Sequence, residues 1–519
     1  MSNNSRSRWK NAIVNSSVLT LLQLLTIILR FINQTFFIHI LGKEFLGLNG
    51  LFSNLLTYLS FAELGIGTSI VFSLYKPLHD NDKKHISALM GFIRRAYILI
   101  GVVISFLGVL LVPVLPYLIK DYDRIPNIPI YFILYLSNSA ISYFYTYKRS
   151  ILIADQKEYK SSFNTFKYTA LQTILQLVVL YYFKAYSLYL IVATMCTLVS
   201  NISISRLVNK EYPYLKKNSK LKLDKLELHE IGKNIIGMIG AKIGTIIVYA
   251  TDNLLLSAFM GLAIVGTYSN YLLIVSSVSA ILTKLVSSVT ASIGNLVVEH
   301  DSKKSFFVFN SHFYVNLIMT TITSACLLVS LNPFIVAWVG NDYLLSRETV
   351  LVIVINYFIN QLRQSIGVFI SAYGLFVPNG KKSVVEALVN FLLSLFFLIE
   401  FNLGIKGVLL GTIVTNLIVN SWLEPFIVFK QGFHLIKYFS KFYLKTYLGN
   451  AVMMMCFIGL SAILVIKIDT YMQFPAILIA IVNSIMVSVL LLLIVSIIFA
   501  KQENFVYIRK KVIDRFLKK

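Results

Sequence analysis

Residues 30–75, RFINQTFFIHILGKEFLGLNGLFSNLLTYLSFAELGIGTSIVFSLY, are apolar enough to cross a lipid bilayer twice as helices. The stretch nevertheless places polar side chains inside both crossings: Arg30, Asn33, Gln34, Asn54 and Glu63. Such groups are costly at membrane depth, and they usually face a cavity or a partner. The stretch therefore predicts membrane helices that surround a polar interior.

The composition of the whole chain extends this interpretation. Its 519 residues are 57% hydrophobic and only 13% charged, with a mean hydropathy of +0.74, whereas about a quarter of the residues of a soluble domain are charged. The net charge of +24 does not indicate a nucleic-acid partner, because the Lys and Arg residues lie in short loops between apolar runs. We therefore predict an all-α polytopic membrane protein with no nucleic-acid partner.

About twenty apolar residues span the hydrocarbon core as a helix, and this length predicts about fourteen spans. They are expected at 12–41, 48–75, 88–118, 129–150, 161–183, 186–206, 232–259, 266–298, 306–338, 348–374, 384–402, 405–428, 446–467 and 474–499. Alternate loops are rich in Lys and Arg, which predicts that these loops and both termini are cytoplasmic.

The longest basic loop follows the sixth span and divides the chain. We expect an N-lobe at 1–206, a cytoplasmic linker at 207–231 and a C-lobe at 232–433. Residues 434–519 are expected to form an amphipathic connector, two further spans and a basic tail. Because the linker is basic and is expected at the cytoplasmic face, we expect anionic lipid head groups to attract it.

An internal repeat relates the two predicted lobes. Gly42 and Gly261 are separated by 219 positions, and so are Gly47 and Gly266. Six spans precede the second copy. Because six is an even number, both copies enter the membrane from the same side. The repeat therefore predicts two six-helix lobes related by a pseudo-two-fold axis along the membrane normal, with a site between them.

The same separation places the polar pair Asn33 and Gln34 on Asp252 and Asn253. Further charges lie deep in the predicted spans: Arg30, Glu63, Lys242, Lys284 and Arg363. One interpretation is pairing, for example of Glu63 with Arg30. Two carboxylates do not neutralise four cations, however, so at least two cations should face water or an anionic ligand.

For other polar residues, the expected depth in the membrane indicates a role less clearly. Glu386 and Glu424 lie near the inner ends of their spans, and we expect them at the membrane interface. Asn54, Tyr268 and Asn270 either join helices by hydrogen bonds or bind sugar hydroxyls, and the sequence leaves both alternatives open.

Several function classes lack their sequence signals. The outer loops are short, the seven histidines are scattered, and there is neither a Walker A motif nor a filter-like element, which argues against an enzyme, an ATPase and a channel. The three cysteines show no metal-binding spacing, so no metal or cofactor is expected. A secondary transporter remains, and its cation-rich interior favours an anionic substrate over a cationic drug.

Three runs carry a resemblance to a known family: GKEFLGLNGLFSNLLTYLSFAELGIGTSIVFSLYKPL, TDNLLLSAFMGLAIVGTYSNYLL with the following SIGNLVVE, and AYGLF…EALVNFLLSL…GIKGVLLGTIVTNL. They resemble the polysaccharide transporter family, flippases for lipid-linked oligosaccharide repeat units within the multidrug/oligosaccharidyl-lipid/polysaccharide exporter superfamily. The resemblance implies two six-helix lobes plus two C-terminal helices.

The resemblance also implies a substrate and a pathway. The substrate would be an undecaprenyl-pyrophosphate-linked oligosaccharide, moved by alternating access from the inner to the outer leaflet of the cell membrane for capsule or exopolysaccharide assembly. Polysaccharide assembly machinery is then a possible partner, alongside anionic membrane lipids. The alternatives are a flippase for the lipid-linked peptidoglycan precursor and a drug/cation antiporter of the same superfamily; a glycan polymerase is a third class.

The resemblance and the depth of the polar residues together give the expected site. Arg30 best matches a first-helix arginine that related flippases use for pyrophosphate, whereas the other cations are chosen by depth. The expected substrate-binding residues are Arg30, Asn33, Gln34, Asn54, Lys242, Asn253, Tyr268, Asn270, Lys284 and Arg363. Glu63 and Asp252, one carboxylate in each lobe, are expected to carry a coupled proton or sodium ion.

Overall fold

The computed structural model describes residues 3–59, 80–120, 122–155, 157–217, 252–287, 301–469 and 475–500, with the short pieces 73–74, 77–78, 223–224 and 293. Side chains are described from residue 21 onward. The described residues form helices and loops without any strand. Nine helical segments in this part of the chain are long and apolar enough to cross a membrane.

Three further helices have a similar length but a more polar composition. They are α5 (Ile128–Ala154), α6 (Glu158–Phe183) and α13 (Arg347–Ala372). Each coincides with a predicted span, and the polar residues that lower its hydropathy are available to line an interior. The predicted fold class, an all-α polytopic membrane protein, is therefore confirmed.

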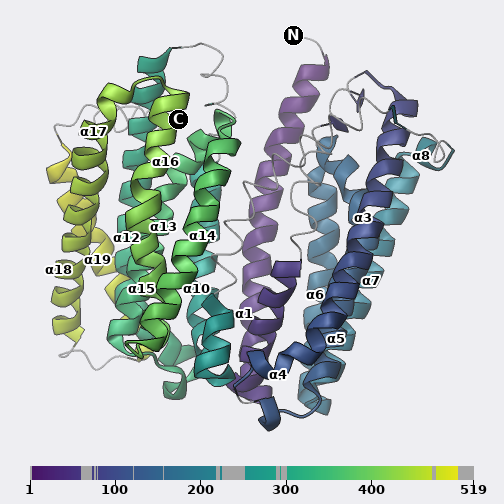
Figure 1. Cartoon of the computed structure of the whole chain (residues 1–519), viewed down its shortest axis with the longest axis horizontal. Coiled ribbons are helices and arrows are strands. Elements are labelled where there is room, and N and C mark those ends of the chain that lie inside the picture. Colours follow the sequence, from purple (N-terminus) through teal and green to yellow (C-terminus); the bar gives the residue numbers. More distant parts are fainter. Residues whose placement is uncertain are drawn as a thin grey trace. The chain divides into compact units, whose positions relative to one another are not determined.

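The first compact unit covers Met1–Gly266. Its described helices are α1 (Asn3–Leu59), α3 (Lys83–Leu111), α4 (Leu115–Leu118), α5, α6, α7 (Tyr186–Glu211) and α8 (Tyr214–Lys217). Helix α5 packs on α3 and α7, and α6 packs on α1 and α7 (Figure 1). Apolar side chains such as Leu89, Ile93, Ile151 and Ile204 are fully buried in a shared core, while other faces of α5, α6 and α7 carry hydroxyl and amide groups.

The second compact unit covers Thr267–Lys519. It contains most of α10 (Leu262–Ser287), then α12 (Ser302–Val339), α13, α14 (Phe376–Ile399), α15 (Ile405–Thr415), η5 (Asn416–Asn420), α16 (Ser421–Ile427), η6 (Val428–Gly432), η7 (Ile436–Tyr438), α17 (Phe439–Lys441), η8 (Phe442–Gly449), α18 (Asn450–Asp469) and α19 (Ala476–Ile498). Helix α12 packs against α13, α18 and α19 (Figure 1). An aromatic cluster around Phe309, Phe369, Phe429 and Phe433 holds one end of this unit together.

Short polar side chains mark where several helices begin. The carboxylate of Asp82 accepts a hydrogen bond from the backbone nitrogen of His85 at 3.0 Å, and Asp301 accepts from the backbone nitrogens of Lys303 and Lys304. Ser346 caps α13 in the same way. These side chains satisfy backbone donors that the first helical turn leaves without partners.

The predicted repeat is visible in the element boundaries. Helices α5 and α13 begin 219 positions apart, and α7 and α15 do so as well. Gly42 interrupts α1 with a φ of 85°, and Gly261 adopts a φ of 89° just before α10. A positive φ is strained for residues with a side chain, which explains glycine at both equivalent positions.

The second pair of repeated glycines makes a reciprocal contact within the first unit. A Cβ atom on Gly47 would overlap the carbonyl oxygen of Leu262 and lie 3.1 Å from the nitrogen of Gly266. A Cβ atom on Gly266 would overlap the carbonyl oxygen of Lys43 and lie 3.1 Å from the nitrogen of Gly47. Lys43 and Leu262 are themselves 219 positions apart. The contact therefore has local two-fold symmetry, as the repeat predicts.

Candidate functional site

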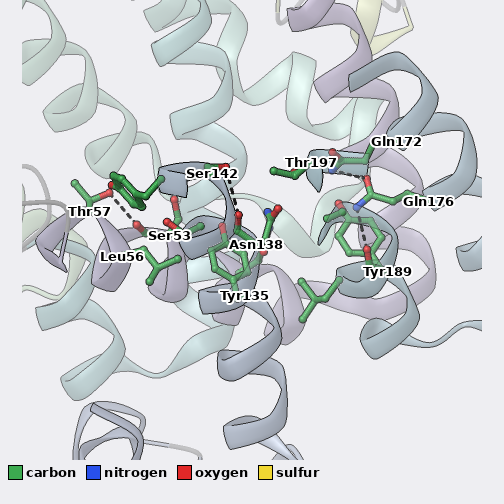
Figure 2. A pocket seen from close by; sticks show the side chains of 15 residues that line it. Ser53, Leu56, Thr57, Tyr135, Asn138, Ser142, Gln172, Gln176, Tyr189 and Thr197 are labelled. Atoms are coloured by element: carbon green, nitrogen blue, oxygen red, sulfur yellow. Dashed lines mark hydrogen bonds between the residues drawn. The ribbon is translucent and has the colours of Figure 1, made fainter. Parts of the chain in front are cut away.

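A cavity of about 450 Å³ lies within the first unit, between α1, α5, α6 and α7. Its lining is polar but uncharged, apart from a few apolar side chains. The lining residues are Asn49, Ser53, Leu56, Thr57, Tyr135, Asn138, Ser139, Ser142, Tyr143, Gln172, Gln176, Tyr189, Leu190, Ala193 and Thr197. Figure 2 shows labelled amides and hydroxyls of α1, α5, α6 and α7 around this space.

Hydrogen bonds orient the amide groups at one side of this neutral cavity. The Nδ2 of Asn33 donates to Oε1 of Gln176 at 2.9 Å and to the Tyr189 hydroxyl at 3.0 Å. The Nε2 of Gln176 donates to the backbone carbonyl of Tyr189 at 3.1 Å, and Gln172 donates to Oε1 of Gln176 (Figure 2). Fixed amides together with aromatic hydroxyls suit a neutral ligand with many hydroxyl groups.

A second cavity of about 410 Å³ shares the lining residues Ser142, Gln172 and Thr197 with the neutral cavity, so the two cavities are adjacent along α5, α6 and α7. Unlike the neutral cavity, it contains a cation, Arg149 of α5. The Nη1 of Arg149 donates to the Thr165 hydroxyl at 2.6 Å, and its Nη2 donates to Oδ1 of Asn201 at 3.2 Å. Both acceptors are uncharged. We call this space the Arg149 cavity.

A third hollow of about 450 Å³ in the same unit is strongly basic. Its lining includes Arg94 and Arg95 of α3 and Lys148 of α5. The Nζ of Lys148 donates to Oδ1 of Asn209 at 2.6 Å. Positive charge thus gathers in the first half of α3 and near the C-terminal end of α5, toward the face that the loop charges predict to be cytoplasmic.

The second unit contains a buried cluster of four charges on α13, α14 and α16, which we call the ion-pair cluster: Arg363, Lys382, Glu386 and Glu424. Arg363 Nε donates to Glu424 Oε2 at 3.0 Å, and Arg363 Nη1 lies 3.3 Å from Glu386 Oε1. Lys382 Nζ lies 2.6 Å from Glu386 Oε2 and 2.8 Å from Glu424 Oε1. Two cations and two carboxylates balance, which lowers the free energy required to bury them.

Asparagines of the π-helical segment η5 complete this cluster. Arg363 and Lys382 donate to the side-chain oxygens of Asn416 and Asn420, at 2.5 and 2.8 Å. The Nδ2 of Asn420 in turn donates to Oε1 of Glu386 at 2.6 Å. A π-helical turn changes the direction of successive side chains and is often found where polar groups must converge.

The ion-pair cluster corrects two expectations. Glu386 and Glu424, expected at the membrane interface, are only 6% and 5% exposed. Helix α14 begins at Phe376 and not near 384, so Lys382 and Glu386 lie inside the helix and face α16. Arg363, one of the four deep cations of which at least two were expected to face water or an anionic ligand, is paired with Glu386 and Glu424. The count of two carboxylates against four cations omitted these two glutamates.

The other residues expected in the first unit lie in different surroundings. Asn33 belongs to the hydrogen-bond network of the neutral cavity. Asn54 donates to the carbonyl of Gly50 in its own helix, although its neighbour Ser53 lines the neutral cavity. Gln34 is half-buried on α1, and Arg30 is exposed and lines neither the neutral cavity nor the Arg149 cavity.

The remaining expected residues are dispersed. The Oδ1 of Asp252 and the Oδ1 of Asn253 are buried and accept no hydrogen bond from the described residues. In the second unit Tyr268 and Asn270 are buried, and Lys284 is exposed. Glu63 and Lys242 lie outside the described residues.

Sequence reasoning missed Arg149, Gln172 and Gln176. Arg149 lies at the end of the expected span 129–150 and was counted with the basic residues of the loop that follows, whereas α5 continues to Ala154 and places Arg149 inside the helix. Gln172 and Gln176 are four positions apart in an otherwise apolar stretch. That spacing places both on one helix face and is a signal of a polar interior.

Comparisons with solved structures identify the fold. The structure is similar to one described as the lipid II flippase MurJ in an inward closed conformation, with a TM-score of 0.66, 14% identity, and coverage of 93% of this chain and 98% of that chain. It is also similar to an inward-facing multidrug resistance MATE family transporter of the MOP superfamily, with a TM-score of 0.60, 14% identity, and coverage of 82% and 99%. A third similar structure is the eukaryotic MATE transporter AtDTX14, at a TM-score of 0.60, 11% identity, and coverage of 84% and 98%.

The chain matches no protein-family model and no curated protein sequence. The structural likeness covers nearly the whole chain and defines the class. The chain is a multi-pass helical membrane protein with the two-lobed fold shared by the MurJ and MATE structures. The predicted two-lobed helical fold is thereby confirmed.

Proposed function

We propose that the chain is a flippase that moves a lipid-linked oligosaccharide across the membrane by alternating access. One observation carries the proposal: a polar, uncharged cavity of about 450 Å³ lies inside a fold otherwise similar to a lipid II flippase. Amides and hydroxyls suit sugar hydroxyls, which are numerous and neutral. The lining includes no carboxylate, so it does not provide the counter-charge that a cationic drug requires.

The cargo we propose is an undecaprenyl-pyrophosphate-linked oligosaccharide, exported from the inner to the outer leaflet of the cell membrane for capsule or exopolysaccharide assembly. Both termini would then lie in the cytoplasm, as the loop charges favour. Anionic lipids and polysaccharide assembly machinery are the partners that this role implies. The neutral cavity would take part of the sugar moiety while the lipid tail stays in the bilayer.

The membrane potential provides a driving force for such a cargo. Moving one charge through 100 mV changes the free energy by about 2.3 kcal/mol, so a pyrophosphate with about two negative charges gains roughly 4–5 kcal/mol on outward transfer. We propose that Glu63 or Asp252 additionally carries a proton or sodium ion. Unchanged transport and ion dependence in both Glu63→Gln and Asp252→Asn would contradict that coupling.

The alternative cargo is the lipid-linked peptidoglycan precursor, which is favoured by one observation, the likeness to a structure described as a lipid II flippase. The two cargoes differ in their sugars, so the precursor that accumulates on deletion separates them. We expect a deletion strain to accumulate lipid-linked repeat units on the cytoplasmic leaflet. Accumulation of the peptidoglycan precursor would favour the alternative, and no accumulation of either would contradict a flippase.

A further inference from the structure

Arg149 carries a positive charge that the described residues leave unneutralised. Its two hydrogen bonds go to the hydroxyl of Thr165 and the amide oxygen of Asn201. No carboxylate among the described residues lies within ion-pair distance of its guanidinium. A guanidinium has five N–H donors in a planar fork, so it retains donors for a further acceptor in the Arg149 cavity.

The ion-pair cluster of the second unit also has a cation beside an asparagine, but there carboxylates neutralise the positive charge. Asn420 lies 219 positions after Asn201 and likewise accepts from a cation, Lys382. There Glu386 and Glu424 supply the negative charge. At the equivalent positions of the first unit, 219 residues earlier, the sequence has Lys167 and Ser205. The cations are not at equivalent positions, because 219 residues before Lys382 and Arg363 the sequence has Phe163 and Phe144, but Arg149 likewise lies beside an asparagine, here without a carboxylate.

From this contrast we propose that the Arg149 cavity binds a phosphate-type anion, and that in the working protein this anion is the diphosphate of the carrier lipid. The inference rests on the proposed flippase function and specifies where the diphosphate binds. An arginine fork matches two phosphate oxygens at once. The hydroxyls of Thr169 and Ser200 also line the space and can donate to a phosphate oxygen.

The adjacency of the two cavities indicates where the sugar attached to the anion would lie. Ser142, Gln172 and Thr197 line both spaces. An anion held at Arg149 would therefore place a covalently attached sugar at the amides of the neutral cavity. The basic hollow around Arg94, Arg95 and Lys148 would raise the local concentration of anionic head groups at the same end of α5.

The test uses full-length protein in phosphatidylcholine nanodiscs, with undecaprenyl pyrophosphate as the probe and undecaprenol as its uncharged counterpart. We expect Arg149→Gln to weaken binding of the pyrophosphate lipid by about tenfold to a hundredfold, and to leave undecaprenol binding unchanged. The matched control is Arg206→Gln, which removes an exposed arginine from α7 of the same unit. Equal affinity of the wild type and Arg149→Gln would overturn the proposal, and so would equal losses in both variants.

A second variant keeps the arginine and changes only its charge balance. Asn201→Asp places a carboxylate beside Arg149, as the second unit does at its own cluster. We expect it to weaken binding of the pyrophosphate lipid as strongly as Arg149→Gln does. Unweakened binding in Asn201→Asp would contradict the account, and this holds even if Arg149→Gln fails to fold.

Competition experiments identify the source of the anion. Inhibition by inorganic pyrophosphate that is lost in Arg149→Gln supports a diphosphate site. Inhibition by phosphatidylglycerol alone would assign the cavity to a bilayer phospholipid and overturn its assignment to the cargo. The proposed function fails separately: wild-type protein that binds the pyrophosphate lipid through Arg149 but never translocates a lipid-linked oligosaccharide would refute the flippase and leave the anion site standing.

Discussion

Replacing Glu424 with Gln tests the charge balance of the ion-pair cluster in the second unit. Glu424 is 5% exposed and accepts from Arg363 Nε at 3.0 Å and from Lys382 Nζ at 2.8 Å. The substitution preserves the size of the side chain but leaves Glu386 as the only carboxylate of the cluster, beside two cations. Removing one partner of a buried ion pair destabilises a protein by about 3–5 kcal/mol, and we expect a loss of this size.

A second substitution should recover part of this loss. Lys382→Met removes the surplus cation, so that Arg363 and Glu386, 3.3 Å apart, remain as a balanced pair. We therefore expect the double variant Glu424→Gln/Lys382→Met to be more stable than the sum of the two single losses predicts. The coupling free energy should be about 0.5–3 kcal/mol, the range for residues in one network.

The assay is denaturant unfolding of the purified wild type, both single variants and the double variant in one detergent. Glu348→Gln is the matched control, because Glu348 pairs with Lys406 at 2.6 Å but is itself 76% exposed, and its loss should change stability little. Additive effects within about 0.5 kcal/mol would refute the coupled cluster. If Glu424→Gln lowers the free energy of unfolding as little as Glu348→Gln does, Glu424 is not part of a buried ion-pair cluster.

Three other predictions follow from the geometry of the first unit. Gly47→Ala and Gly266→Ala should lower the thermal unfolding midpoint by similar amounts, because their contacts are reciprocal; a large effect of one and none of the other would contradict the symmetry. Gln176→Leu should reduce transport of a lipid-linked oligosaccharide about tenfold or more through loss of one or two hydrogen bonds, and unreduced transport would exclude the neutral cavity as the sugar site. Burial lowers the pKa of Lys157, but the carboxylates of Asp155 and Glu211 outweigh burial and raise this pKa above 10.5. The stabilisation from these ion pairs is therefore present at neutral pH and is lost as the pH rises past the raised pKa. Asp155→Asn should reduce this alkaline loss in thermal unfolding, and an unchanged loss would contradict the role of Asp155.

Much of the fold is predictable because a bilayer restricts the possible structures. Span length gives the order of the helices, whereas the direction in which each crosses the membrane stays a prediction from the loop charges. The separation of 219 positions predicts the repeat, which the boundaries of α5, α7, α13 and α15 confirm. Gly42 and Gly261 were detectable because a positive φ demands glycine in both copies.

The site was predicted less well, because hydropathy gives the depth of a residue but not its partners. Asn33 proved to donate hydrogen bonds to two residues that line the neutral cavity, yet one of them, Gln176 of α6, is 143 positions away in sequence. The burial of Glu424 was not predicted, because its partners Arg363 and Lys382, which make burial favourable, lie on other helices. Arg149, at the end of the expected span 129–150, was likewise counted with the loop cations, because its sequence position does not show that Thr165 and Asn201 lie beside it.

The central claim, that the chain flips a lipid-linked oligosaccharide, is tested most directly in proteoliposomes. Purified protein is reconstituted with undecaprenyl-pyrophosphate-linked oligosaccharide, and an enzyme added outside modifies the sugars that are accessible on the outer leaflet. The account predicts that the protected fraction becomes accessible in wild-type vesicles and stays protected in protein-free vesicles and, at early times, in Gln176→Leu vesicles. Equal accessibility in wild-type and protein-free vesicles would contradict the account.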